Sequence, residues 1–569
     1  MKFPLAYSQR QVIPQNVGPT VLGDIIGSPA LTVSSDYFNG TAWFAISLTG
    51  AASGASPVAT PKILVGKWIS QANDLTLAPM TNVNLLPSTN NELSTNTGDT
   101  QPTIAFGPNL ECYVAFATNG SMPNRYNMST VPSFCPGITS GTSDIVVAQV
   151  FTSPSFDITS LNVTANWWIQ DASLNSANNE YNPQLCCDRT NRFLYLVHQC
   201  DANILCFPTI GTGPNVVLSC ITLTSNPKLP APGATGAVVW REAQTGINCA
   251  GATTNPAIAT DQNGGVYVAV EINAPIDGGA TPETTQVIDV IKFQNYSVTP
   301  YNAATTPLYE IPPGIFLYPP PPCPPPNYVP PSAMSRSYVL SGISPSIFPP
   351  DGVCTKPSIA CDPVGGRVVL AFTTTGTMPG QTQSSYLEPG GSDVVVISFK
   401  SNGTLLTVSQ GDMWSPMFNP YTSARDVSLT SDDAGNIFLS YIIKTAAGTE
   451  SVLAYQLQPS TLEPFWNYEE PGGIDYTAYA YAMTGAPNAI YNTGPVGSFT
   501  KTPPAIILDR LFIATSSTQT PIGGATPPQH GLTVTGFTNT LYTFDTSVFN
   551  YMANSKSICA CASNNCGCS

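Results

Sequence analysis

One pattern of apolar and polar positions recurs along the whole chain: an apolar run that opens with proline, a polar turn, and a second apolar run. The clearest copy covers residues 255–271 and reads N-P-A-I-A-T-D-Q-N-G-G-V-Y-V-A-V-E. Its second run, Val266 to Val270, is apolar at every position, whereas a strand with one wet face alternates. The pattern therefore predicts a β-hairpin buried on both faces, as between stacked sheets. Because proline cannot donate a ladder hydrogen bond, Pro256 is expected at the first position of its strand.

The polar turn opens with an aspartate in four copies, at Asp188, Asp261, Asp362 and Asp432. Asp and Asn side chains bond to nearby backbone groups, and the glycines that follow accept positive φ. Turn capping is therefore the favoured interpretation of these aspartates. A calcium site or a ring of catalytic carboxylates is the alternative.

The hairpin can be found seven times. Its first residue is proline in every copy but one, at Pro29, Pro102, Pro183, Pro256, Pro357, Val427 and Pro504. A third run follows, with near-identical starts in Ser143–Val150 and Ser392–Phe399, and a fourth run often ends near a tryptophan. Self-similarity at a nearly fixed period indicates a repeat architecture. Four strands in each of seven repeats predict an all-β fold, a seven-bladed β-propeller with long inter-strand loops.

The repeat can be written P-x-I-A-x-D-x-x-G-x-x-Y-V-A followed by S-D-hydrophobic-V. It resembles bacterial-type β-propeller repeats of the SBBP kind and, more loosely, NHL-like blades. The resemblance covers most of the chain and implies a propeller scaffold. The alternatives are a string of small β-sandwiches and a triple-stranded fibre; a sandwich needs about seven strands, and about four are found in each repeat.

The repeats divide the chain into three parts. Residues 1–26 are a candidate closing strand, in which Met1 to Val12 adds to the last sheet, unless the chain closes without it. Residues 27–550 form the propeller, with a proline-rich insertion at 312–331 that favours polyproline II. The insertion is either a recognition segment, with Tyr318 and Tyr328 as anchors, or a stiff surface loop. Residues 551–569 are a cysteine-rich tail.

The composition is poor in charge and points to an outward-facing protein. Charged residues make up 9% of the chain, against about 25% in typical soluble proteins. The net charge is −15 with 19 Lys and Arg, so no nucleic-acid partner is expected. No apolar run reaches about 18 residues, so no membrane span is expected. The start of the chain shows no recognisable signal peptide, and the expected location is a virion surface, in a large virus, or the extracellular space.

Fifteen cysteines support the same location, because disulfides persist outside the cytosol. The candidates for disulfides are Cys200, Cys206, Cys354, Cys361, Cys559, Cys561, Cys566 and Cys568. The last four are close together in the tail and are also candidate ligands for zinc or copper(I), although C-x-C is not the usual zinc spacing. Cross-linking or local disulfides are favoured over a metal site. The adjacent Cys186 and Cys187 are expected to point to opposite faces of a strand.

No sequence motif of a known catalytic site occurs: G-x-S-x-G, H-E-x-x-H, a Walker loop and a dinucleotide fingerprint are all lacking. The nearest approach to the Asp box of sialidase-like propellers is Ser431–Phe438, which we interpret as a hairpin turn. His198, at the end of an apolar strand, is interpreted as a core-edge residue. The chain is therefore not expected to be an enzyme, and no cofactor is expected.

Three hypotheses about function follow. The first is a non-catalytic structural or surface-interaction protein, a scaffold for assembly with other protein subunits, including copies of itself, in a virion coat or fibre. The second is a secreted propeller module that binds glycans. The third is a propeller hydrolase or lyase, which would need a cluster of Asp, Glu and Arg near the axis.

Overall fold

The structure is a computed structural model of the 569-residue chain. It describes residues 13–16, 21–25, 30–34, 41–52, 58–70, 77–78, 98–107, 112–120, 142–151, 164–170, 174–176, 178–188, 193–201, 213–223, 237–242, 247–249, 251–261, 264–273, 286–295, 334–339, 352–362, 366–410, 421–431, 437–448, 450–457, 460–462, 464–469, 481–484, 509–517, 531–539, 560–562 and 565–567.

The described strands form seven sheets of four or five strands and one two-stranded hairpin. We call the seven sheets blades and number them in chain order. Blade one contains β2 (Val21–Ile25), β3 (Ala30–Ser34), β4 (Thr41–Ala52), β5 (Val58–Ser70) and β6 (Leu77–Ala78). Blade two contains β7 (Asp99–Phe106), β8 (Cys112–Thr118), β9 (Asp144–Phe151) and β10 (Thr164–Ile169). Blade three contains β11 (Glu180–Cys187), β12 (Phe193–Cys200), β13 (Asn215–Thr222) and β14 (Ala237–Glu242).

Blade four contains β15 (Thr253–Thr260), β16 (Gly265–Ile272), β17 (Val287–Asn295) and β18 (Met334–Val339). Blade five contains β19 (Cys354–Asp362), β20 (Arg367–Thr374), β21 (Asp393–Lys400) and β22 (Leu405–Gln410). Blade six contains β23 (Tyr421–Ser431), β24 (Ile437–Thr445), β25 (Glu450–Leu457) and β26 (Pro464–Glu469). Blade seven contains β27 (Tyr481–Thr484), β28 (Asp509–Ser517), β29 (Gly531–Asn539) and β1 (Ile13–Asn16). The hairpin in the tail consists of β30 (Ala560–Ala562) and β31 (Asn565–Gly567).

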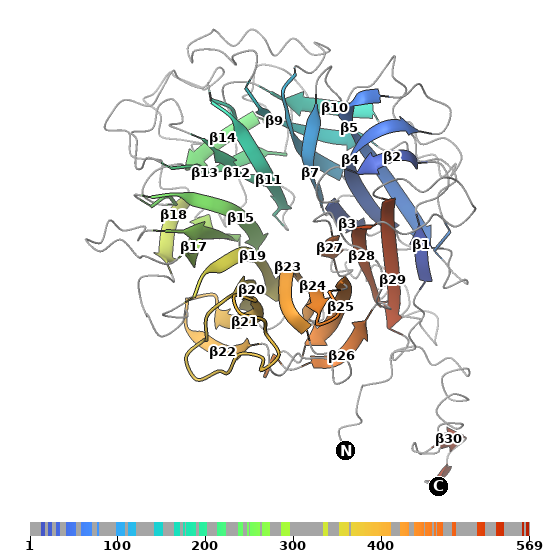
Figure 1. The fold of residues 1–569 in the computed structure, drawn as a ribbon. Helices are drawn as coiled ribbons and strands as arrows, with labels where there is room; N and C mark the ends of the chain where they lie inside the picture. Colours follow the sequence, from blue (N-terminus) through green and yellow to red (C-terminus); the bar gives the residue numbers. More distant parts are fainter. Residues whose placement is uncertain are drawn as a thin grey trace.

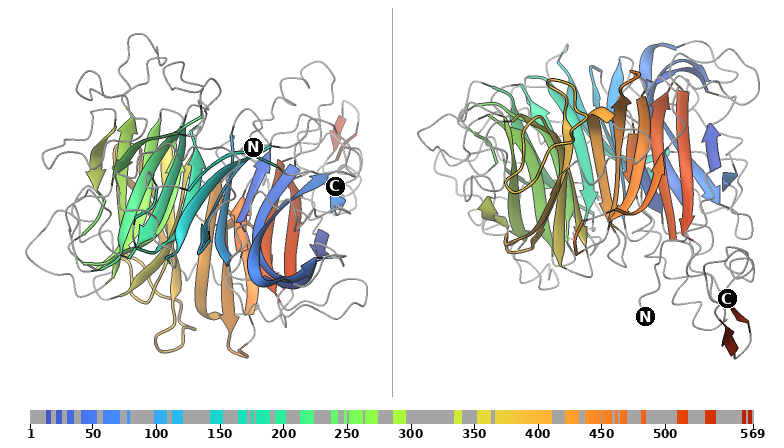
Figure 2. Two further views of the ribbon diagram at one scale, coloured as in Figure 1. Left: turned by 90° about the horizontal axis from the view of Figure 1, so that it is seen from above. Right: turned by 60° about the horizontal axis from the view of Figure 1, so that its bottom comes forward.

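The blades are arranged in a closed ring around one axis (Figure 1). The innermost strands contact one another in turn, in the order β3, β7, β11, β15, β19, β23, β27 and back to β3. Figure 2 shows from the side that the sheets stand next to one another around the ring. The predicted all-β propeller class is confirmed, and separate β-sandwiches are excluded for the described strands. The described part of the chain holds no helix long and apolar enough to cross a membrane.

The two ends of the propeller meet in blade seven. There β1 pairs antiparallel with β29, with Ile13 opposite Gly536. A strand from the start of the chain thus completes a sheet built from its last repeat, and an open ring with an unpaired edge is avoided. The closing strand lies inside residues 1–26, whereas Met1 to Val12 lies outside the described residues.

The hairpin of blade four forms for the reasons that its sequence gives. All eight residues of β16 are buried, as its unbroken apolar run predicts. Asp261 caps the turn: its Oδ1 accepts a hydrogen bond from Gly265 N at 2.7 Å, and its Oδ2 accepts one from Tyr267 Oη at 2.9 Å. A Cβ on Gly265 would lie 2.5 Å from Asp261 Oδ2, so a larger residue here would displace the capping carboxylate.

The prediction that proline begins the strand is wrong for the four described prolines, Pro102, Pro183, Pro256 and Pro357, which lie inside their strands. β15 begins at Thr253, and its register with β16 shifts between Thr254 and Ala257. Asn255 and Pro256 therefore form a β-bulge inside the strand, where the missing N–H of proline breaks no ladder bond. The innermost strands β7, β11 and β19 have the same bulge at their prolines, and β23 has it at Val427.

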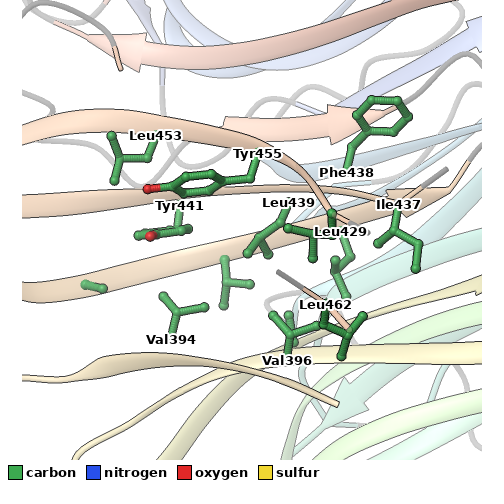
Figure 3. Packing of buried hydrophobic residues seen from close by; sticks show 14 of the residues in the cluster. Val394, Val396, Leu429, Ile437, Phe438, Leu439, Tyr441, Leu453, Tyr455 and Leu462 are labelled. Atoms are coloured by element: carbon green, nitrogen blue, oxygen red, sulfur yellow. The ribbon is translucent and has the colours of Figure 1, made fainter. Parts of the chain in front are cut away.

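Apolar side chains fill the spaces between blades. Separate buried clusters join blade two to three, three to four, four to five and five to six. Figure 3 shows the last of these, where Val394 and Val396 of blade five pack against Leu429 and Leu439 of blade six. Burial of apolar surface contributes about 25 cal/mol per Å². These clusters therefore supply the main attraction between neighbouring blades.

Blade seven differs from the prediction. Residues 504–508 of the predicted first run lie outside the described residues. In the described sheet β27 is the innermost strand, and Asp509 begins β28. This copy lacks the glycine turn, so its first two runs could not be told apart by pattern.

Several predicted features lie outside the described residues: the proline-rich insertion at 312–331, Asp432, Cys206, Cys559 and Cys568. In the tail, Cys561 lies opposite Cys566 in the backbone register of β30 and β31.

Candidate axial binding site

Five polar residues of the innermost strands have left-handed backbone conformations. Their φ values are 52° at Gln101, 51° at Asn182, 45° at Asn255, 51° at Lys356 and 53° at Asp426. Each lies directly before the proline or valine of its bulge. A non-glycine residue in this region costs about 1 kcal/mol or more, and such strain gathers where a side chain has to be aimed. We call these five residues the axial ring.

The axial ring lies on five innermost strands that contact each other in turn. The bulge is at the third and fourth residues of β7, β11, β15 and β19, and at the sixth and seventh residues of β23, which begins earlier. All five residues are half-buried. Their side chains and backbone join neighbouring blades. Asn182 N donates to Gln101 Oε1 at 2.8 Å, and Lys356 Nζ forms an ion pair with Asp426.

The carboxylate of Glu271 supports the ring from blade four. It is 2% exposed and accepts hydrogen bonds from Thr254 Oγ1 at 3.2 Å and from Gln286 Nε2. It also accepts a bond from the backbone N–H of Lys356 in blade five. Glu271 therefore holds the left-handed residue of the next blade in place.

Blade six provides the remaining charges. Asp426 forms ion pairs with both Lys356 and Arg425, and Arg425 Nη2 lies 2.6 Å from Glu450 Oε2. Burial opposes the charge of Arg425, but the hydrogen bond to Glu450 and the charges of Asp426 and Glu450 more than offset it and raise the pKa of the guanidinium. We call Glu271, Lys356, Arg425, Asp426 and Glu450 the axial charged cluster.

The site thus has two halves of different chemistry. Blades two to four contribute the amides of Gln101, Asn182 and Asn255, which both donate and accept hydrogen bonds. Blades five and six contribute ion-paired ammonium, guanidinium and carboxylate groups. The arrangement can bind a polar ligand through many directional contacts.

Two buried carboxyls lie close together at the junction of blades two and three. Asp144 begins β9 and is 2% exposed; Glu180 begins β11, is 0% exposed, and donates its N–H to Ser143 O at 2.7 Å. Glu180 Oε1 accepts hydrogen bonds from Ser176 N at 2.8 Å, from Ser176 Oγ and from Cys200 Sγ at 3.6 Å. Among the described residues, Asp144 Oδ1 and Glu180 Oε2 have no hydrogen-bond partner.

Burial raises the pKa of both carboxyls. It raises the pKa of Asp144 to about 6, which a hydrogen bond from Gln170 partly opposes. It raises the pKa of Glu180 to about 7; bonds from Ser176 oppose this shift and the negative charge of Asp144 adds to it. The pair lies at the blade junction and not in the axial ring, so we assign it no part in binding; its ionisation lowers the stability of the fold as pH rises.

The repeated aspartates do not gather into a site. Asp261 caps its turn as described above, and Asp362 Oδ2 forms an ion pair with Arg367 at 2.7 Å across its own hairpin. Asp188 N donates to Phe193 O at 3.0 Å in the corresponding turn. A side-chain cap of the turn is thus seen at Asp261, while the Asp362 carboxylate pairs with Arg367. Within the described ranges, no group of three or more His, Cys, Asp or Glu could hold a metal ion.

The predicted disulfide candidates that the structure describes are thiols at Cys200, Cys354 and Cys361. No bridge joins Cys354 to Cys361, a pairing that the sequence left open along with the others. The two residues lie in β19, seven positions apart (361 − 354), which is about 23 Å of extended strand. A disulfide needs Cα atoms within about 7 Å. Cys186 and Cys187 end β11 as adjacent strand residues, and His198 is 0% exposed within β12.

Sequence reasoning missed the axial ring, although a signal was present. The residue before the repeated proline is polar in five copies: Ser28, Gln101, Asn182, Asn255 and Lys356. Asparagine adopts the left-handed conformation more readily than most residues. A proline expected at the first position of a strand puts the preceding residue outside the strand, so the pattern predicts no role for that residue.

Comparisons with known proteins add little beyond the architecture. The sequence matches no protein-family profile and no curated protein. Among solved structures, it is similar to a protein of unknown function from Dyadobacter fermentans, with 11% identity over 77% of this chain and 94% of that chain, TM-score 0.40. It is also similar to Trypanosoma rangeli sialidase, with 9% identity over 100% of this chain and 64% of that chain, TM-score 0.35. A third is the GH93 α-L-arabinofuranosidase of Fusarium graminearum, with 11% identity, 77% and 92% coverage, and TM-score 0.35.

Proposed function

We propose that this chain is a non-catalytic binding propeller whose ligand is a carbohydrate held at the axial ring. The observation that carries the proposal is the set of five equivalent left-handed polar residues on neighbouring innermost strands. A carbohydrate presents hydroxyl groups that donate and accept in several directions. Amides donate and accept hydrogen bonds and carboxylates accept them, so such groups placed around one axis can bond to several of these hydroxyls.

The charges of the site favour binding over other roles. Lys356 and Arg425 are engaged by carboxylates of the same cluster, which leaves the site without the excess positive charge that a nucleic acid requires. The cluster of Asp, Glu and Arg near the axis is also what a propeller hydrolase would need. However, Asp426 is shared between two cations and Glu450 is paired with Arg425, so these carboxylates serve to order the site.

The test removes amides without disturbing the backbone. Glycine has no steric penalty at positive φ, so Asn182→Gly with Asn255→Gly deletes two ring side chains and relieves strain. We expect wild-type protein to bind oligosaccharides on a printed array, and the double variant to bind the best-bound one at least about 10-fold more weakly by calorimetry, since each lost hydrogen bond contributes about 1 kcal/mol.

Asn402→Gly is the matched control. Asn402 is exposed, lies in the turn between β21 and β22, and is absent from the axial ring. Its affinity for the same oligosaccharide should equal that of wild type. An array without any bound carbohydrate, or a double variant with wild-type affinity, would refute the proposal.

A second candidate function is that of a subunit in an extracellular or virion assembly. Leu405 and Leu406 are 39% and 41% exposed and lie on β22, the last strand in the sheet of blade five. Edge strands with exposed apolar residues pair readily with other chains. We expect wild-type protein to self-associate in sedimentation velocity and Leu406→Lys to be monomeric; a wild type that stays monomeric at every concentration would count against self-assembly.

A further inference from the structure

We infer that Tyr386 is an aromatic platform for a second sugar unit, on a loop at the same end of the propeller as the axial ring, so that the ligand is an oligosaccharide and not a single sugar. The inference rests on the proposed carbohydrate function. It concerns the loop of residues 375–392, which joins β20 to β21 and which the sequence analysis did not single out.

The loop leaves the propeller at the end where the axial ring lies. Thr374, the last residue of β20, pairs with Cys354, the first residue of β19, and Lys356 is two residues further along β19. The base of the loop is tied to the same place: Thr375 N donates to Val353 O at 3.1 Å, and Val353 N donates to Thr375 Oγ1 at 3.0 Å.

The loop also reaches from blade five to blade six. Glu388 N donates to Thr422 O at 3.0 Å, and Glu388 Oε1 forms an ion pair with Lys444 at 2.9 Å. A Cβ on Gly391 would lie 2.3 Å from Thr422 O, so the close approach of the two backbones requires glycine. Thr422 belongs to β23, the strand that carries Arg425 and Asp426.

Hydrogen bonds within the loop fix its shape. Gln381 N donates to Met378 O at 2.9 Å, and Leu387 N donates to Ser384 O at 3.3 Å. Met378 is 1% exposed, and its N–H donates to Gln410 Oε1 at 2.6 Å. Ser384 is 4% exposed, and its N–H donates to Asp393 Oδ2 at 3.1 Å. Tyr386 lies between these anchored residues.

Tyr386 is 56% exposed, more than any other large hydrophobic residue among those that the structure describes as exposed. A rigid aromatic side chain offers a large amphipathic surface at a small entropic cost, because it has only two rotatable side-chain bonds. Val353, which is 40% exposed, lies three positions before Lys356 in the sequence and bonds to Thr375 at the base of the loop. Polar groups at the axis and an apolar, aromatic strip beside them suit a chain of sugars: hydroxyls meet the axial ring, and the C–H face of a further ring stacks on Tyr386.

The test uses two substitutions of one residue. Tyr386→Ala removes the platform, and Tyr386→Phe keeps its apolar area. By titration calorimetry with the oligosaccharide that binds best on the array, we expect Tyr386→Ala to bind about 10-fold more weakly and Tyr386→Phe to stay within about twofold of wild type. With the terminal monosaccharide of that oligosaccharide, Tyr386→Ala should bind like wild type.

The outcomes separate this inference from the proposed function. If Asn182→Gly with Asn255→Gly weakens both oligosaccharide and monosaccharide binding while Tyr386→Ala changes neither, the platform is refuted and the axial site stands. Equal losses for Tyr386→Ala with the oligosaccharide and the monosaccharide would also refute it, because the platform then contributes no separate subsite. If no carbohydrate binds the wild type, the proposed function fails, and the platform fails with it.

Discussion

Glu180→Gln is expected to stabilise the protein by about 3 kcal/mol at pH 8 and to change its stability little at pH 4. Glu180 is fully buried, and its pKa is raised from 4.5 to about 7. One pKa unit corresponds to about 1.4 kcal/mol, so the shift of about 2.5 units amounts to about 3 kcal/mol. Glutamine keeps an oxygen that accepts the hydrogen bonds from Ser176, and it cannot ionise.

The sign follows from proton linkage. Between about pH 4 and pH 7 the unfolded chain has released the proton of Glu180, while the folded chain still holds it. The folded state therefore binds more protons, and the free energy of unfolding falls as pH rises through this range. Burial raises the pKa of Asp144 from 3.8 to about 6, so this carboxyl contributes to the same fall in the free energy of unfolding. Below about pH 4 both carboxyls are protonated in the folded and in the unfolded protein, so Glu180→Gln removes no charge there.

The measurement is the free energy of unfolding in urea from pH 4 to pH 8, followed by tryptophan fluorescence. Glu388→Gln is the control, because Glu388 is 43% exposed in its side chain and pairs with Lys444 at the surface. Exposed ion pairs contribute about 0–1 kcal/mol, so this variant should follow the wild-type curve closely. Parallel curves for Glu180→Gln and wild type would show that Glu180 ionises in the folded protein without cost.

Tyr441→Ala is expected to destabilise the protein by about 3–5 kcal/mol, the range for large aromatic residues removed from a core. Tyr441 is 0% exposed and lies in the cluster between blades five and six (Figure 3). Its ring stacks on Tyr455 with centroids 5.8 Å apart and meets Tyr421 edge-on at 6.3 Å. Alanine would leave a cavity at the surface by which the two blades attract each other.

Tyr386→Ala provides a matched control for the same chemical change. Tyr386 is 56% exposed, and surface substitutions of this kind change stability by about 0.5 kcal/mol or less. Urea unfolding of both variants at one pH gives the comparison. Equal losses would show that the inter-blade cluster does not hold the ring together. The control also establishes that Tyr386→Ala folds, which its use in binding experiments requires.

The propeller could be predicted from the sequence because strands inside its sheets are buried on both faces. Unbroken apolar runs such as Val266 to Val270 cannot be half-wet strands, and their repetition gave the architecture. Blade seven was misassigned where this signal weakened. The run that begins at Pro504 has no glycine turn, so pattern alone could not show that β27 precedes it in the innermost position.

The axial ring could not be predicted in the same way, because it depends on backbone angles and on neighbours far apart in sequence. Asn182 and Gln101 meet across 81 residues, and Lys356 and Asp426 meet across 70. Pattern reasoning places residues within one strand, whereas these contacts arise only when the ring brings innermost strands together. The bulge at Pro256 is a local exception to regular strand geometry, and it aims the residue that precedes it.

A crystal structure that resolves the backbone of the innermost strands tests the central claim most directly. The account predicts seven sheets in one closed ring, with φ near +50° at Gln101, Asn182, Asn255, Lys356 and Asp426. Sheets that form separate units, or an extended backbone at these five residues, would contradict it.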